Sequence, residues 1–172
     1  SDSAASAAEA GGDLTGLSAA AKVFCSEGAF AICDAALQLH GAMGFLEQTG
    51  VARALRDCRI TRIFEGANDV LLVHLGAGLL VARARPETPT SGHPAFDEFD
   101  HRLARLVAEN RTEFGVRGTQ RQLLTSRLAR AEVCALAARA SLDRAATEPE
   151  SAELAAFAVE QLTREGHRQL DA

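Results

Sequence analysis

The sequence contains no tryptophan or tyrosine, and Met43 is its single methionine. It also lacks a basic excess, since 18 Lys and Arg residues stand against 23 Asp and Glu residues and give a net charge of −5. Nucleic-acid binding usually requires a basic face, so a nucleic-acid partner is disfavoured. The longest strongly apolar run, residues 70–82, is interrupted by His74 and is shorter than the ~18 residues of a membrane span. The composition, 47% apolar and 24% charged, is that of a globular protein.

Patterns typical of metal or disulfide frameworks are also absent. The four cysteines form no CxxC pair, so neither a zinc site nor a dense disulfide framework is expected. We expect buried free thiols, in a reducing compartment, at Cys25, Cys33, Cys58 and Cys134. His93, His101 and His167 lie in the linker or on polar faces with no second histidine or cysteine at i+4, and we predict no bound metal.

The start of the chain is small and polar, without the basic and apolar regions of a signal peptide. Because the chain starts at Ser1, we interpret it as the C-terminal piece of a longer protein. Arginine supplies 17 of the 18 basic residues. This bias and the lack of a targeting segment favour the bacterial cytoplasm, or the mitochondrion if the source is eukaryotic.

The sequence predicts an all-α fold, because Ala, Leu, Arg and Glu dominate and period-2 alternation is scarce. Apolar residues recur at helical spacing from Ser18, a candidate N-cap, to His40. Further helical segments are expected at residues 50–60, 70–84, 94–110, 119–146 and 151–170. The stretch 85–93 is rich in proline, and we predict that it links two helical parts, residues 1–84 and 94–172.

Glu65 is a candidate general base. It lies in a short glycine-bearing turn after the apolar Ile63 and Phe64 and just before a helix start. A carboxylate among apolar neighbours has its charged form disfavoured, which raises its pKa toward the range useful for proton abstraction. The alternative is that Glu65 caps a helix or pairs with a nearby arginine. From the residues alone that is the commoner explanation, with Arg56, Arg59 and Arg62 as candidates.

A second candidate segment runs from Gln38 to Phe45 and contains two glycines. The glycines would let a ligand approach the backbone closely, or they mark only a helix stop and a turn. The residues alone leave both interpretations open.

Three motifs in order carry a resemblance to a known family. They are QLHGAMGF at residues 38–45, RDCRI at 56–60 and IFEGANDVL at 63–71. In this order and spacing they resemble the C-terminal helical domain of acyl-CoA dehydrogenases over residues 18–84. The stretches 122–129 and 139–142 resemble the extra helical domain of the very-long-chain subgroup, which implies that residues 94–172 are a C-terminal helical extension.

The resemblance implies a FAD-dependent enzyme of fatty-acid β-oxidation that dehydrogenates long-chain acyl-CoA thioesters. Glu65 would be the base that removes the α-proton, while hydride passes to flavin N5. The thioester carbonyl would accept a hydrogen bond from the Glu65 amide, and Gly66 would give the acyl chain room. Electron-transfer flavoprotein is the implied electron acceptor. The remaining domains of such an enzyme hold most of the flavin and substrate, so this chain alone is not expected to turn over.

The resemblance also implies FAD contacts from two segments. One consists of Gln38, Leu39, His40, Gly41 and Ala42, which would reach the FAD of a neighbouring subunit and so imply a homodimer or a higher oligomer. The other is the turn beside the subunit's own flavin, formed by Ala67, Asn68 and Asp69.

Three residues depart from the family pattern. Ala67 replaces a threonine, Ala42 replaces a glycine and Leu72 replaces a basic residue. They motivate an alternative function, a non-catalytic binding or assembly module that keeps the fold. An acyl-CoA oxidase-like enzyme with the same base is a third possibility. The helices of residues 94–172 are rich in Ala and Arg and poor in large apolar residues, which gives little support to membrane insertion and leaves peripheral attachment open.

Overall fold

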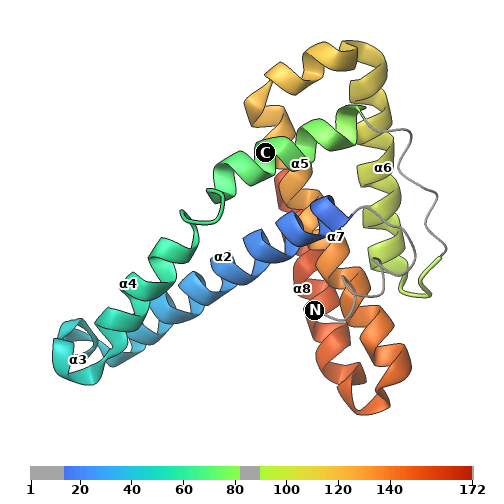
Figure 1. The fold of residues 1–172 in the computed structure, drawn as a ribbon. Coiled ribbons are helices and arrows are strands. Elements are labelled where there is room, and N and C mark those ends of the chain that lie inside the picture. Colours follow the sequence, from blue (N-terminus) through green and yellow to red (C-terminus); the bar gives the residue numbers. More distant parts are fainter. Residues whose placement is uncertain (1–13, 82–89, 172) are drawn as a thin grey trace.

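The computed structural model describes residues 14–81 and 90–171, and within them every regular element is helical. The predicted all-α fold is confirmed. Two antiparallel helices, α2 (Leu14–His40) and α4 (Val51–Thr61), lie side by side and project from the rest of the molecule (Figure 1). The far end of this pair is closed by α3 (Ala42–Phe45) and the short η1 (Glu47–Thr49). We call residues 28–61 the arm.

The remaining helices form the body of the molecule, together with residues 14–27 of α2 (Figure 1). The helix α5 crosses α7, while α6 and α8 pack along α7. Their bounds are α5 (Asn68–Val81), α6 (Pro94–Phe114), η2 (Gly115–Gln120), α7 (Gln122–Thr147), η3 (Pro149–Ser151) and α8 (Ala152–Asp171). Pro94 suits the first position of α6, and the His93 ring caps that helix by accepting a hydrogen bond from the Phe96 amide at 3.4 Å.

The body is held by apolar packing centred on α7. One face of α6 packs against α7 and against Val159 of α8. The buried residues on this face are Phe96, Phe99, Leu103 and Val107. Glycine permits the closest approaches. A Cβ at position 166 would lie 2.3 Å from the Phe99 ring, and one at position 76 would lie 2.0 Å from the Thr125 carbonyl oxygen. Large side chains are therefore excluded from both crossings.

A second buried cluster joins the arm-bearing helix to the body. It consists of Ala20 and Val23 of α2, Leu72 of α5, and Ala129 and Val133 of α7. Residues from both predicted parts of the chain thus share each core cluster, since Leu80 of α5 also packs with α6 and α7. The division into two domains stays a prediction, and residues 82–89, which include most of the predicted linker, lie outside the described residues.

The observed helix bounds follow the sequence closely for α4, α5, α7 and α8. The helix α6 continues to Phe114, past the expected end at residue 110, and η2 occupies residues 115–120. The first described helix begins at Leu14 rather than at Ser18. The stretch 41–50, which lies between two expected helices, contains α3 and η1. Gly44 explains the compactness of this stretch, because a Cβ there would come within 2.7 Å of the Leu37 carbonyl oxygen.

By length and composition alone, residues 15–40 of α2 are long and apolar enough to cross a membrane. The helix contains no long run of large apolar residues, because alanine, glycine and serine separate its large side chains. Most of the helix surface is exposed in the structure, although Ala20 and Val23 are buried. Helices of soluble proteins and signal sequences meet the same criterion.

Candidate functional site

The turn between α4 and α5 has an unusual backbone at Glu65. Its φ of 56° makes it the one non-glycine residue in the left-handed region among those the structure describes, and Gly66 follows with φ of 100°. A non-glycine side chain in this region costs on the order of 1–3 kcal/mol, and such residues cluster at functional sites. The conformation therefore requires contacts that hold the turn.

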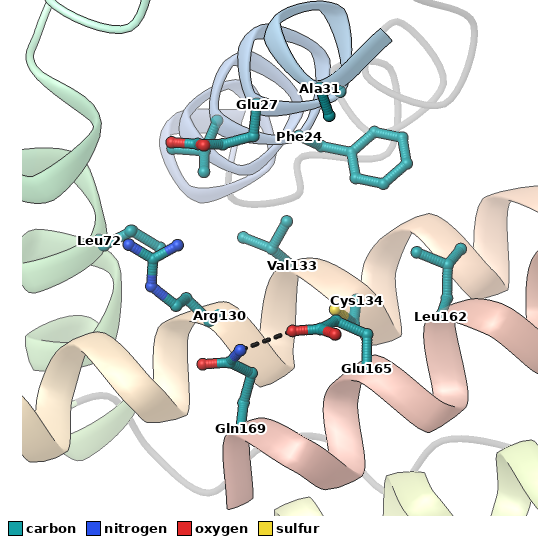
Figure 2. A pocket seen from close by; sticks show the side chains of 12 residues that line it. Phe24, Glu27, Ala31, Leu72, Arg130, Val133, Cys134, Leu162, Glu165 and Gln169 are labelled. Atoms are coloured by element: carbon teal, nitrogen blue, oxygen red, sulfur yellow. Dashed lines mark hydrogen bonds between the residues drawn. The ribbon is translucent and has the colours of Figure 1, made fainter. Parts of the chain in front are cut away.

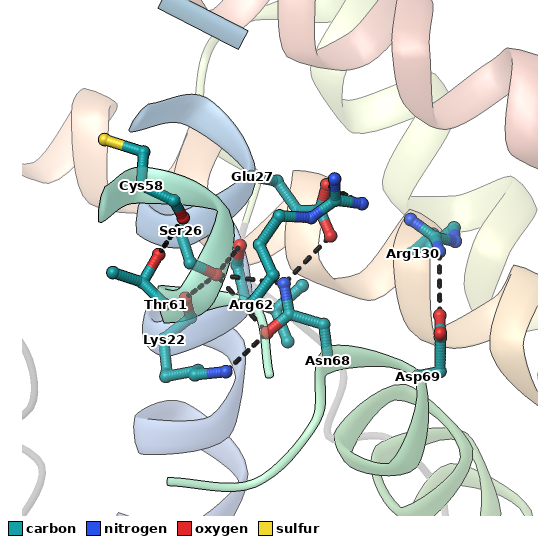
Figure 3. A network of polar contacts seen from close by, with 10 residues as sticks. Lys22, Ser26, Glu27, Cys58, Thr61, Arg62, Asn68, Asp69 and Arg130 are labelled. Atoms are coloured by element: carbon teal, nitrogen blue, oxygen red, sulfur yellow. Dashed lines mark hydrogen bonds and ion pairs between the residues drawn. The ribbon is translucent and has the colours of Figure 1, made fainter. Parts of the chain in front are cut away.

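Lys22 of α2 supplies the first of these contacts. Its Nζ donates to the Gly66 carbonyl at 2.7 Å and to Asn68 Oδ1 at 2.6 Å. The Asn68 amide in turn donates to Ser26 Oγ at 2.9 Å and to Glu27 Oε1 at 2.8 Å (Figure 3). Asn68 is only 4% exposed, and its bond to Ser26 is buried while its bonds to Lys22 and Glu27 are partly buried. The start of α5 is thereby fixed to α2.

Arg62 fixes the other end of the turn. Its guanidinium pairs with Glu27 at 2.9 Å and lies over the Phe30 ring, 4.9 Å from the centroid. The Arg62 carbonyl also accepts a bond from the Asn68 backbone N–H at 3.0 Å, which closes the turn on itself. All the α2 partners lie on one side of that helix, since Lys22, Ser26, Glu27 and Phe30 are spaced at i, i+4, i+5 and i+8. We call Lys22, Ser26, Glu27, Arg62 and Asn68 the turn network.

The Glu65 side chain itself is exposed. In the described part of the chain it forms no ion pair, because Arg56 pairs with Glu47 at 2.9 Å and Arg62 pairs with Glu27. The expected pairing of Glu65 with a nearby arginine is thus not found. The expected apolar enclosure is not found either, since Ile63 and Phe64 are 50% and 45% exposed. Glu65 is a free carboxylate on a rigid turn, open to a ligand.

The first motif lies far from this turn. Gln38, Leu39, His40, Gly41 and Ala42 are all exposed at the end of the arm. Gln38 lies twelve positions after Ser26 in the same helix, which corresponds to about 18 Å at the rise of an α-helix. Within one chain, the two segments predicted to contact FAD therefore do not meet.

The residues after Glu65 have distinct environments. The Asp69 side chain is 94% exposed and pairs with Arg130 at 3.7 Å. Leu72 is fully buried in the cluster between α2, α5 and α7. The departure from the family pattern at this position therefore lies in the apolar packing between these helices.

The fit of these residues to FAD differs between the two segments. The end of the arm fits, because it is exposed and a Cβ at Gly41, whose φ is 56°, would meet nothing within 4 Å. A flat ligand can therefore reach this backbone. Asn68 does not fit, since both ends of its amide are already bonded to α2. Within the described residues its side chain anchors the turn, and its contact with FAD stays a prediction.

A cavity of about 440 Å³ lies between α2, α5, α7 and α8 and does not include Glu65 among its lining residues (Figure 2). Its walls are mainly apolar, with Val23, Leu72 and Val133 among them. Glu165 at its rim accepts a hydrogen bond from Gln169 at 2.6 Å. Burial raises the pKa of the Cys134 thiol in this wall to about 12, so that thiol stays protonated and unreactive at neutral pH.

Comparison with known proteins agrees with the motif order. A family model for the acyl-CoA dehydrogenase C-terminal domain matches residues 2–80. The chain is 57% identical over 53 residues to a mitochondrial very long-chain specific acyl-CoA dehydrogenase of Mus musculus, covering 31% of this chain and 8% of that protein. It is 36% identical over 115 residues to 3-methylmercaptopropionyl-CoA dehydrogenase of Ruegeria pomeroyi, covering 64% of this chain and 17% of that protein. The first half of the chain belongs to the acyl-CoA dehydrogenase family.

The predicted family is thereby confirmed. A further member, the mitochondrial isobutyryl-CoA dehydrogenase of Bos taurus, is 40% identical over 68 residues, which is 40% of this chain and 16% of that protein. The chain thus spans less than a fifth of the length of these relatives. Sequence reasoning identified the motifs but missed Lys22, Ser26 and Glu27. The one available clue was that Lys22 is the single lysine of the chain.

Proposed function

We propose that Glu65 is the general base of a FAD-dependent acyl-CoA dehydrogenase acting on long-chain acyl-CoA thioesters in fatty-acid β-oxidation. This chain would be a piece of that enzyme. The observation that carries the proposal is the state of Glu65, a carboxylate without an ion-pair partner among the described residues, on a left-handed turn fixed by the turn network. A rigid, unpaired carboxylate at the position of the family motif suits proton abstraction.

In this mechanism Glu65 accepts the α-proton of the thioester. Its own backbone N–H has no backbone acceptor in the described part of the chain, so it can donate to the thioester carbonyl. That bond would stabilise the negative charge that develops on the carbonyl oxygen as the proton leaves. Bound FAD would supply the hydride acceptor at flavin N5. Glycine at position 66 suits this turn, because its φ is 100° and a Cβ there would come within 3.2 Å of the Leu71 side chain. Gly66 would also give the acyl chain room.

The cofactor arrangement that we propose requires two copies of the protein. The exposed residues 38–42 would contact FAD held mainly by a neighbouring subunit, while the turn after Glu65 would lie beside the subunit's own FAD. The separation of about 18 Å between the two segments within one chain supports this division. Enclosure of Glu65 would come from the substrate, the cofactor and parts of the enzyme outside this chain. Electron-transfer flavoprotein would be the electron acceptor.

A non-catalytic assembly module is the second candidate function. It is favoured by the exposed apolar side chains of the arm, which include Ile32, Leu39 and Phe45 at 72%, 87% and 76% exposure. Such side chains suit contact with another protein surface. In that case the protein would lack flavin and would still bind its partners.

Dye reduction by the intact enzyme, driven by acyl-CoA, tests the base. The Glu65→Gln variant should lose about 10²- to 10⁴-fold in turnover while its flavin absorbance stays unchanged, because the proton acceptor is removed and the shape is kept. Glu65→Asp should retain measurable turnover. The matched control is Glu109→Gln, which alters an exposed glutamate of α6 that pairs with Arg105 at 3.7 Å. Full turnover in Glu65→Gln would remove Glu65 from the mechanism, and an intact protein without flavin would support the assembly module.

A further inference from the structure

Two cysteines from different helices of the arm contact each other. The Sγ atoms of Cys33 in α2 and Cys58 in α4 lie 3.3 Å apart, and both residues are partly exposed. The expected burial of the thiols is therefore correct for Cys134 only, since Cys25 is exposed. In Figure 3 the Cys58 sulfur points away from the turn network, so this thiol takes no part in holding the Glu65 turn.

The distance between the sulfurs leaves little movement before a bond can form. A disulfide holds its sulfurs about 2.05 Å apart, so an approach of about 1.3 Å would suffice. The helices α2 and α4 lie side by side along the arm, and Ala52 is the single buried residue of α4 in the described structure. Because few buried side chains would have to shift, a change of cysteine rotamers can bring the sulfurs together.

We propose that Cys33 and Cys58 form a dithiol modification site, which a peroxide oxidises to a disulfide between α2 and α4. One thiol attacks hydrogen peroxide to give a sulfenic acid and one water molecule. The second thiol attacks that sulfur, the S–S bond forms, and the sulfenic oxygen leaves as a second water molecule. The two sulfurs together lose two electrons and two protons, and one peroxide is reduced to two waters.

The disulfide would constrain both segments of the candidate site. It closes a loop between two residues 25 positions apart, and this loop contains residues 38–42 at the end of the arm. On the other side, Cys58 lies in α4, the helix that leads directly into Arg62 and the Glu65 turn. Cross-linking limits the freedom of the unfolded chain, so the oxidised arm should unfold at a higher temperature than the reduced arm.

Peptide mapping of the intact protein after treatment with hydrogen peroxide tests the proposal. Free thiols are alkylated, and the protein is cut with trypsin and a glutamate-specific protease. Because Glu27 lies between Cys25 and Cys33, these two cysteines fall on separate peptides. The expected product is the Cys33 peptide joined to the Cys58 peptide, about 2 Da lighter than their sum and separated again by dithiothreitol.

Three variants complete the test. Cys33→Ser and Cys58→Ser should each abolish the joined peptide, and oxidation should no longer raise their melting temperature. Cys25→Ser is the matched control on the same helix and should give the joined peptide in full. A joined peptide that depends on both Cys33 and Cys58 supports the site. Alkylation of both cysteines after oxidation of the wild-type protein, or their recovery as separate oxidised thiols, would overturn it.

Discussion

The body and the arm of this molecule are stabilised by different interactions. The body buries phenylalanine, leucine and valine side chains of α6 against α7 and α8, and its helices cross at glycines. The arm buries little, and at its base the turn network of charged and amide side chains fixes α4 and α5 to α2. Apolar packing tolerates small shifts of side chains, whereas hydrogen bonds depend on direction. The difference suggests that the body supplies stability and that the turn network supplies the position of Glu65.

Truncation of a core phenylalanine should give the largest loss of stability. Phe99 is fully buried, so Phe99→Ala should lower the free energy of unfolding by about 3–5 kcal/mol. Phe45→Ala in the arm removes the same ring from a residue that is 76% exposed and should change stability by less than about 0.5 kcal/mol. Urea unfolding of the two variants measures both values. Equal losses would contradict the assignment of the core to the body.

Removal of the central amide of the turn network should have an intermediate effect. Asn68→Ala leaves Lys22 and Glu27 without a buried partner and should cost about 1–3 kcal/mol of unfolding free energy. Turnover of the intact enzyme should fall as well, because the Glu65 turn loses its anchor. Glu109→Ala is the matched control, since that side chain is 59% exposed and its ion pair with Arg105 is 3.7 Å long. A stable Asn68→Ala variant with full turnover would show that the network is dispensable.

The smallest expected effect concerns acid stability. Burial raises the pKa of Asp97, but bonds from the Ser91 backbone N–H at 2.9 Å and the Ser91 hydroxyl at 2.7 Å outweigh it and hold the pKa below its ordinary value of 3.8. A lowered pKa in the folded state gives stability that is complete above pH 3.8 and is lost as the pH falls through the folded-state value. Ser91→Ala should therefore lose less stability on acidification than the wild-type protein.

Glu47, a carboxylate of the arm, contrasts with Asp97 of the body. A hydrogen bond from Arg56 lowers the pKa of Glu47, and both side chains are largely exposed. Added salt should remove the contribution of this pair, because screening acts on exposed charges. The Asp97 contribution should persist in salt, since it comes from hydrogen bonds. Thermal unfolding at low and high salt near pH 5 separates the contribution of the Glu47–Arg56 pair from that of Asp97. Equal salt sensitivity of the two contributions would contradict this difference.

The sequence predicted the helices of the body well, because each has a long run of residues at helical spacing with a clear stop. It also made Glu65 a candidate base, because the motif that contains this residue is contiguous in the sequence. It did not predict the turn network, since Lys22 and its partners Gly66 and Asn68 are separated by 44 and 46 residues. The burial of Leu72 against α2 and α7 was not predicted either, because it depends on contacts distant in sequence.

Exchange of the α-hydrogen of an acyl-CoA with deuterated water is the most direct test of the central claim. This exchange needs a base at the α-carbon and does not depend on an electron acceptor. We predict that the intact wild-type enzyme incorporates deuterium at this carbon, as followed by mass spectrometry. Glu65→Gln, with its flavin still bound, should incorporate none above the rate without enzyme. Exchange at the wild-type rate in Glu65→Gln would contradict the account.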